Sequence, residues 1–287
     1  MPTSKKPRKK AAAKKKSQMA DVIRFAPKTP AFEGFMSGFG GRPVDQAQDV
    51  MYDAWECGDP KQRVALAREA LDISPLCADA YVLLAKEAAR SQEEALAYYK
   101  QAVEVGAEAL GPAAFQEYAG HFWGFVETRP YMRARTGLGE ALWVTGEKDA
   151  AIQNFREMLE LNPGDNQGIR YVLAAKLLEI GRMDELKSLL EKCADEYSAD
   201  IQYTRALLAY FEDAENAEEI AELAWDTNQH VPGMLSGRIA TVELHDYITM
   251  GGKDEASSYV GAFGGAWKRT PGAIEWLEEV TGLLESR

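Results

Sequence analysis

The side chains with the clearest potential for chemistry lie together in residues 121–135, HFWGFVETRPYMRAR. His121, Glu127 and Arg129 could supply a base, a carboxylate to orient it and a cation to stabilise an anion. A histidine beside aromatic residues is, however, more often a hydrogen-bonded packing residue than a catalytic base. The sequence also contains no GxSxG, HExxH, Walker or GxGxxG motif. We expect a protein that is not an enzyme, and an active site at His121–Arg129 is the least favoured alternative.

Metal, redox and membrane chemistry also find little support in the sequence. Cys57, Cys77 and Cys193 show no CxxC spacing, and an odd, unpatterned count is typical of a reduced chain. We therefore expect no metal ion and no cofactor. No apolar run approaches the ~20 residues that cross a bilayer. The first residues, MPTSKKPRKK, lack the apolar core of a secretory signal, so we expect a cytoplasmic protein without a membrane span.

The elements that must position these side chains are best defined in residues 134–163, ARTGLGEALWVTGEKDAAIQNFREMLELNP. Small residues fall where two helices would cross closely, a glycine falls at the turn between them, and a proline ends the second helix. The pattern resembles one tetratricopeptide repeat (TPR), a helix–turn–helix unit of about 34 residues. Its diagnostic positions are Leu138, Gly139, Leu142, Gly146, Ala151, Phe155 and Pro163.

The same register recurs along the chain. A unit of this kind cannot bury its apolar face alone, so it needs stacked neighbours. We therefore predict an all-α fold, a right-handed, TPR-like superhelical solenoid of helix pairs with a capping C-terminal helix. Thr270 is expected to begin that last helix, with Pro271 at its first position. The expected solenoid covers residues 44–287, with units near 44–77, 78–105, 132–166, 167–200 and 201–234, an insert at 106–131 and a capping segment at 235–287.

The first helix of each TPR unit lines the concave face of the solenoid. The register places Arg133, Glu140, Trp143 and Val144 of one unit and Tyr171 of the next on that face. Aromatic and arginine side chains are the types most able to carry binding energy in such a groove. The sequence thus favours a non-enzymatic scaffold that binds a peptide or helix of a partner protein. The predicted partner-binding residues are Trp123, Arg129, Arg133, Glu140, Trp143, Arg170 and Tyr171.

A structural role for the same residues is the alternative, because ion-pair networks often imitate sites. The arginines could neutralise nearby carboxylates, and Trp143 could pack beneath the insert. The residues that clamp a chaperone's C-terminal carboxylate are absent, since the relevant positions hold Thr136 and Glu140, or Val82 and Lys86. Outside residues 1–16, 25 basic residues face 45 acidic ones, a net charge of −20. That balance predicts a basic or neutral partner.

The composition of residues 1–20 predicts a disordered basic tail, because these residues offer little apolar surface to bury. The tail could keep the chain soluble, or it could contact nucleic acid, the ribosome or anionic lipid through counterion release. A protein that acts on nucleic acid or the ribosome through this tail is the alternative function. In a eukaryotic host, KKPRKKAAAKKK also resembles a nuclear-import signal, which makes the nucleus the alternative location. The contact residues would be Lys5, Lys6, Arg8, Lys9, Lys10, Lys14, Lys15 and Lys16.

Residues 21–43 are expected to form a linker whose phenylalanines cap the first unit, or else a docking segment for a partner. Further along, residues 54–105 resemble the suppressor-of-tumorigenicity-seven family, above all in Ala54-Trp55-Glu56 and in ADAYVLLAKE (residues 78–87). Residues 50–280 are similar to bacterial TPR proteins that bear FWGFVETRPYMRAR and NPGDNQGIR. This resemblance implies the repeat fold but brings no catalytic residues or defined ligand. The eukaryotic members carry membrane-spanning segments, which we do not expect here.

Overall fold

The computed structural model describes residues 41–245 and 247–283, and the regular structure within these ranges is helical throughout. The basic tail and residues 21–40 of the linker lie outside the described residues. The chain divides into two units, Met1–Arg42 and Pro43–Arg287, and the fold below is that of the second unit.

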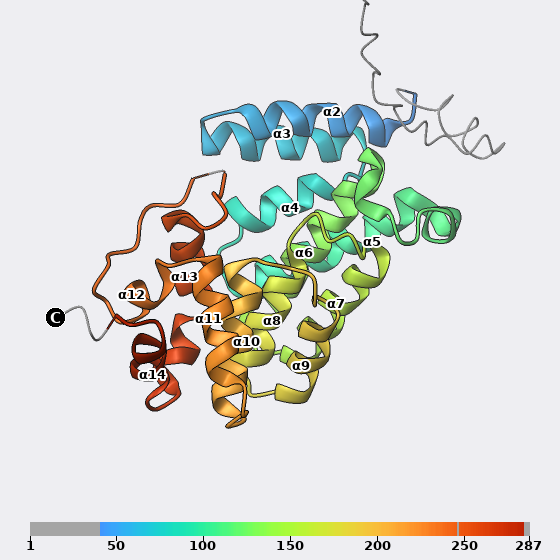
Figure 1. Ribbon diagram of the computed structural model, residues 1–287. Coiled ribbons are helices and arrows are strands. Elements are labelled where there is room, and N and C mark those ends of the chain that lie inside the picture. Colours follow the sequence, from blue (N-terminus) through green and yellow to red (C-terminus); the bar gives the residue numbers. More distant parts are fainter. Residues whose placement is uncertain (1–40, 246, 284–287) are drawn as a thin grey trace, which may run out of the picture. The chain divides into compact units, whose positions relative to one another are not determined.

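Ten helices of this unit follow one another as five successive pairs (Figure 1). Each helix packs against the next, and the first helices of neighbouring pairs also touch, as α2 touches α4 and α4 touches α6. This arrangement is the predicted all-α, TPR-like solenoid of helix pairs. The pairs are α2 (Pro43–Glu56) with α3 (Pro60–Ile73), α4 (Ala78–Glu87) with α5 (Gln92–Glu117), α6 (Arg129–Val144) with α7 (Lys148–Leu161), α8 (Ile169–Glu179) with α9 (Met183–Glu191), and α10 (Ala199–Phe211) with α11 (Ala217–Thr227).

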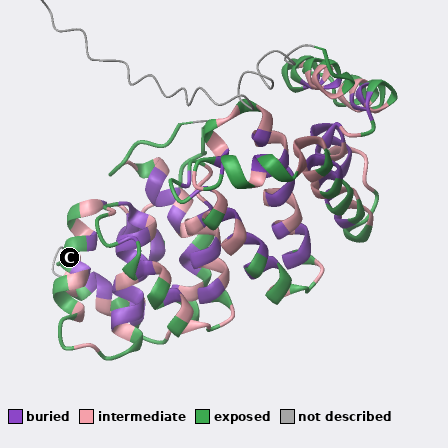
Figure 2. Cartoon of the chain, turned by 90° about the vertical axis from the view of Figure 1, so that its right-hand side faces the viewer, coloured by how far each residue is buried: buried purple, intermediate pink, exposed green. Residues whose placement is uncertain are grey.

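The α6–α7 pair shows why small residues recur at fixed positions. A Cβ atom on Gly139 would lie 2.5 Å from the ring of Phe155, which is fully buried on α7. Ala151 is fully buried at the same crossing, and Gly146 turns the chain with a φ of 89°. The close crossing predicted from the sequence is thus confirmed. These residues belong to the larger apolar core, and buried residues concentrate where helices face each other (Figure 2).

The segment between the second and third pairs differs in form from a simple insert. Helix α5 continues from the repeat into this segment as far as Glu117, with one break at Gly111, whose φ is 72°, before Pro112. Two short 3-10 turns follow, η1 (Phe122–Gly124) and η2 (Val126–Thr128). Phe122 and Thr128 are fully buried, and the Thr128 hydroxyl donates to the backbone oxygen of Phe122. The segment is therefore a packed extension of α5 rather than a free loop.

The C-terminal segment contains more helix than the sequence suggested. After α12 (Val231–Leu235), helix α13 (Lys253–Arg269) packs against both α8 and α10. Glu255 fixes this packing, because its buried carboxylate accepts the N–H of Ala199, the first residue of α10, at 2.9 Å. The last helix, α14, spans Ala273–Val280, and Gly272, with a φ of 78°, precedes it. The prediction that Thr270 caps this helix, with Pro271 at its first position, was therefore wrong by two residues.

Candidate functional site

Arg133, on α6, forms an ion pair with a buried carboxylate. Its Nε–H donates to Oδ1 of Asp79 at 2.9 Å, and its Nη2 group donates to Oδ2 of the same carboxylate. Asp79, on α4, is fully buried and also accepts from Nε2 of Gln48, on α2, at 2.8 Å. This two-point contact joins three successive first helices. It leaves the Arg133 guanidinium little capacity for a partner.

Trp143 and Glu140 lie in a second network, on the surface shared by α6 and α8. Trp143 is 8% exposed, and the ammonium groups of Lys148 and Lys176 lie 4.8 and 5.0 Å from its ring centroid. A cation placed over an indole ring is attracted by the ring's quadrupole. Lys176 also pairs with Glu140 at 3.2 Å, and the Glu140 side chain stays 45% exposed. Glu140 is therefore accessible, whereas the Trp143 ring lies beneath lysine side chains.

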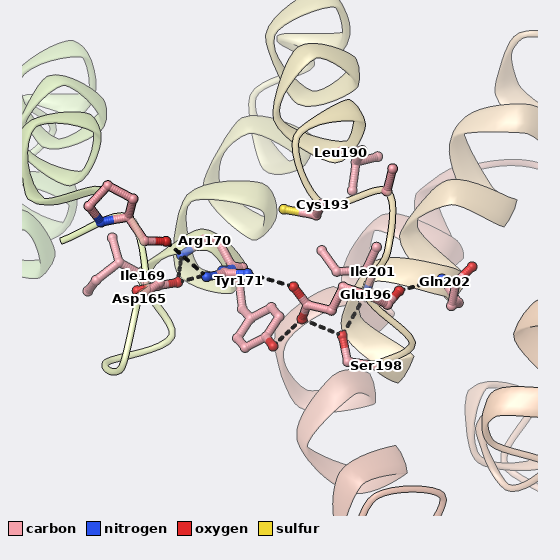
Figure 3. Close-up of polar contacts among 12 residues, drawn as sticks. Asp165, Ile169, Arg170, Tyr171, Leu190, Cys193, Glu196, Ser198, Ile201 and Gln202 are labelled. Atoms are coloured by element: carbon pink, nitrogen blue, oxygen red, sulfur yellow. Dashed lines mark hydrogen bonds and ion pairs between the residues drawn. The ribbon is translucent and has the colours of Figure 1, made fainter. Parts of the chain in front are cut away.

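Arg170 and Tyr171, at the start of α8, form a third network around Glu196 (Figure 3). Nη1 of Arg170 donates to one oxygen of Glu196 at 2.8 Å, while the Tyr171 and Ser198 hydroxyls donate to the other oxygen. Nε of Arg170 donates to the buried Asp165 at 2.9 Å. Burial and the hydrogen bond to Glu196 raise the pKa of the Tyr171 hydroxyl. Glu196 is thus fully engaged inside the protein.

Asp165 also organises the start of α8. Its carboxylate accepts the backbone N–H of Ile169 at 2.7 Å and that of Arg170 at 2.8 Å. These are free amide groups of the first helical turn, which a side-chain oxygen commonly satisfies. Asp165 itself has a φ of 46°, a backbone conformation that aspartate tolerates better than most residues. The crowded polar turn NPGDNQGIR therefore builds a helix start.

Trp123 and Arg129 pair with each other at the edge of the α5 extension. The Arg129 guanidinium lies 5.6 Å from the Trp123 ring centroid, and its Nε–H donates to the Trp123 backbone oxygen at 3.1 Å. Beside them, the rings of Tyr118 and Phe125 stack at 4.0 Å. The Arg129 guanidinium therefore contacts its own segment. This engagement does not favour a role in stabilising an anion.

A cleft of about 390 Å³ opens between α4, α5 and α6. Its walls are apolar near Ala141 and Val144, and Val144 is 59% exposed. Lys86 and Arg90 line it from the end of α4, and Lys86 also lies 5.6 Å from the ring of the half-exposed Trp55 on α2. The surface around this cleft continues into Glu140 and the Trp143 network. We name it the first-helix surface, comprising Trp55, Lys86, Arg90, Glu140 and Val144.

Another cleft, of about 660 Å³, opens between α7, α8 and α9. Leucine side chains form much of its wall, and Arg156 and Arg170 lie on its rim. Both arginines are already paired with carboxylates, Arg156 with Glu185 and Arg170 with Asp165 and Glu196. This second cleft is apolar, and of its cations only Lys192 shows no ion pair within the described part of the chain.

Sequence reasoning identified the repeat positions of Glu140 and Val144 but did not find the cleft. Arg90 was missed because the turn between α4 and α5, at residues 88–91, is shorter than the repeat pattern requires. Trp55 was noted in the sequence only as part of the family resemblance. Its position near the end of a first helix could have indicated that it lies on the binding surface. The eight basic residues proposed for nucleic-acid contact, between Lys5 and Lys16, lie outside the described residues.

Across residues 41–245 and 247–283, no group of three or more histidine, cysteine or carboxylate side chains could hold a metal ion. Among the helices of the same ranges, none combines the length and apolarity that crossing a membrane requires. The three cysteines carry free thiols, and burial raises the pKa of Cys77 to about 12, so its thiol stays protonated at neutral pH.

Comparison with known proteins relates the chain to one family. The family model described as ST7 protein matches residues 41–121. The human suppressor of tumorigenicity 7 protein-like is 28% identical over 264 residues, covering 83% of this chain and 45% of its own length. The chicken protein of the same name is 29% identical and covers 82% and 46%. The chain is therefore similar to ST7 proteins over most of its length, and it spans about half the length of the curated relatives it matches.

A solved structure with similar architecture is described as YrrB, a TPR protein with an unusual peptide-binding site. The two chains share 18% sequence identity, and the alignment covers 69% of this chain and 92% of YrrB with a TM-score of 0.45.

Proposed function

We propose that the chain is a protein-interaction scaffold and that the first-helix surface holds a segment of its partner. The observation that carries this proposal is the cleft between α4, α5 and α6, with the exposed Val144 in its wall and Trp55 and Lys86 beside it. Consecutive first helices form a concave surface in repeat proteins, and an extended peptide or a helix can lie along it.

The exposed groups of this surface suit such a partner. An aromatic ring with a polar edge, a branched apolar side chain and charged groups of both signs lie within one contiguous area. Apolar contacts that exclude water supply most of the energy at such interfaces, while the polar rim fixes orientation. Glu140 keeps its predicted contact role here.

The other predicted binding residues have a supporting role in this proposal. Arg133 and Arg170 hold first helices in place through Asp79 and Glu196, and Trp143 forms the base on which Lys148 and Lys176 rest. Removing either arginine would leave a buried or partly buried carboxylate without its counter-charge, which destabilises a fold. A loss of binding in such variants would therefore follow from a disturbed fold, and it would not show that the arginine touches the partner.

The test is affinity capture from native lysate of the source cells with Trp55→Ser/Val144→Ser. Both side chains are substantially exposed, at 37% and 59%, so the variant should keep its helical content and its melting temperature. The proposal predicts that proteins captured by the wild-type chain are lost from this variant. The matched control is Phe211→Ser/Leu223→Ser, which removes two side chains that are 58% and 55% exposed on α10 and α11.

Equal capture by the wild type and Trp55→Ser/Val144→Ser would refute the first-helix surface as the binding site. The alternative of nucleic-acid or ribosome contact through Lys5–Lys16 is tested in the same experiment by nuclease treatment and by deletion of residues 1–16. That alternative predicts captured material that disappears in both cases and that weakens steeply with salt.

A further inference from the structure

We infer that the cleft between α4, α5 and α6 selects a partner segment that carries carboxylates next to an apolar side chain. This inference rests on the proposed function, because it names the chemistry of the partner at the same surface. It differs from the basic or neutral partner expected from net charge. The reason lies in how charges are distributed around the cleft.

The cations of the cleft lack counter-charges. Lys86 and Arg90 are exposed, and neither forms an ion pair with a carboxylate of the described residues. The nearby Glu94 accepts the backbone N–H of Arg90 at 2.7 Å. Its carboxylate is thereby drawn to the start of α5. The Arg90 guanidinium and the Lys86 ammonium group, which lies over the Trp55 ring, are therefore without an acidic partner among the described residues at one rim of the cleft.

The single acid that lines the cleft is already paired. Glu140 lies 3.2 Å from the ammonium group of Lys176. Next to that pair, Lys148 lies against the Trp143 ring and within 3.7 Å of Glu179. With Glu94 included, the cleft and its immediate border thus hold four cations and three acids, and the two cations of the rim, Lys86 and Arg90, are the ones without an ion pair in the described part of the chain.

This local excess of positive charge opposes the charge of the rest of the chain. Residues 17–287 carry a net charge of −20. Exposed charges beyond about 8 Å are largely screened at physiological ionic strength, so the groups that touch a bound segment decide its charge. The distant acids would act mainly by keeping strongly acidic ligands from binding elsewhere on the body. A segment with carboxylates should therefore bind at the cleft and at few other places.

The cleft also offers contacts for an apolar side chain. Apart from its cations, Glu140 and two polar residues of the α5 start, its lining consists of Ala85, Ala89, Ala95, Tyr99, Gly137, Ala141 and Val144. Tyr99 is buried, and its ring is wedged directly against Gly137 of α6, so this wall is fixed in position. A pre-formed apolar wall favours an apolar side chain without a cost for reorganisation.

Selection of peptides from a random display library of about twelve residues, using the full chain as bait, tests the inference. We expect enriched peptides that combine Asp or Glu with a Leu, Ile or Phe side chain. Their affinity should fall about tenfold or more in Lys86→Glu/Arg90→Glu and should weaken as salt is added. The matched control is Lys61→Glu/Arg68→Glu on α3, which makes the same charge change at two exposed positions and should bind as the wild type does.

Two other outcomes overturn the inference in distinguishable ways. Enriched peptides that are neutral or basic, and that lose binding to Trp55→Ser/Val144→Ser, would disprove the preference for acids and leave the proposed function standing. Peptides that bind both cleft variants as well as the wild type, or the absence of any enrichment, would overturn the inference and the proposed function together.

Discussion

At the scale of single residues, Asp79 shows how this chain uses a buried charge. Its carboxylate meets the guanidinium of Arg133 at two points and the amide of Gln48 at a third, with no exposure to water. Burying two charges costs solvation, so the pair adds specificity of arrangement more surely than net stability. The contact fixes the relative position of α2, α4 and α6, which are the helices that carry the first-helix surface.

Breaking this pair from one side should be costly. Asp79→Ala is expected to lower the free energy of unfolding by about 2–4 kcal/mol, because it removes a fully buried hydrogen-bonded carboxylate and leaves the partly buried Arg133 cation without its partner. Urea unfolding followed by circular dichroism measures the loss. The matched control is Asp149→Ala, which removes an acid that pairs with Arg182 but is almost fully exposed, and it should change stability little. Equal losses in the two variants would contradict this account of Asp79.

A second residue-scale prediction concerns Asp200, in the first turn of α10. Burial, together with the nearby carboxylate of Glu255, raises the pKa of Asp200 to about 6. The folded chain therefore holds this proton up to a higher pH than the unfolded chain, whose aspartate pKa is about 3.9. The ionised carboxylate thus reduces stability above pH 6, and this cost disappears as the pH falls toward 4.

Asp200→Asn should accordingly raise the melting temperature at pH 7.5 and make little difference near pH 4. Melting curves across this pH range check the prediction, with the exposed Asp195→Asn as the control. A stabilisation by Asp200→Asn that stays constant over the whole range, or that grows at low pH, would refute the raised pKa.

At the scale of helices, glycine substitutions separate close crossings from open surface. A Cβ atom on Gly137 of α6 would overlap the buried ring of Tyr99, whereas a Cβ on Gly261 of α13 would meet no atom within 4 Å. Gly137→Ala should therefore destabilise the protein by about 1–3 kcal/mol through overpacking. Gly261→Ala should stabilise it by about 0.5–1 kcal/mol, since alanine restricts the unfolded chain and favours helix.

Chemical denaturation of both variants measures the change in the free energy of unfolding. The test is strict because the two changes are expected to have opposite signs. Gly137→Ala should also weaken peptide binding at the cleft, because Tyr99 forms part of its wall. A Gly137→Ala protein as stable as the wild type would show that α5 and α6 do not cross as closely as described.

Some helices of this chain could be predicted from the sequence and others could not. The helix pair α6–α7 follows from Gly139, Ala151 and Phe155, because steric fit at one crossing dictates residue size at fixed spacing. Helix α13 could not be predicted in the same way, since no repeat pattern marks it and three glycines lie in its second half. Its place depends on a tertiary contact, the buried carboxylate of Glu255 at the start of α10.

The candidate site could be predicted only in part, because tertiary contacts decide it as well. The repeat register placed Glu140 and Val144 on first helices, but the partners of the polar residues are set by long-range contacts. Arg133 meets Asp79 across 54 positions of sequence, and Arg170 meets Glu196 across 26. No local pattern encodes such pairs, so residues that looked free for a ligand proved to be engaged within the fold.

At the scale of the whole molecule, the stacked helix pairs offer an extended surface of the kind that we propose for a partner protein. The similarity to suppressor of tumorigenicity 7 protein-like covers most of this chain. Outside residues 1–16, the net charge of −20 disfavours association with nucleic acid. The cationic rim of the cleft is where we propose that an acidic segment binds.

Photo-crosslinking inside the source cells tests the claim that a partner protein lies on the first-helix surface. A photoreactive side chain is placed either at Val144 or at Leu223, which are 59% and 55% exposed. We predict that light produces a discrete protein adduct from position 144 and none of that mass from position 223. Adducts from position 223 alone, or the same products from both positions, would contradict the claim.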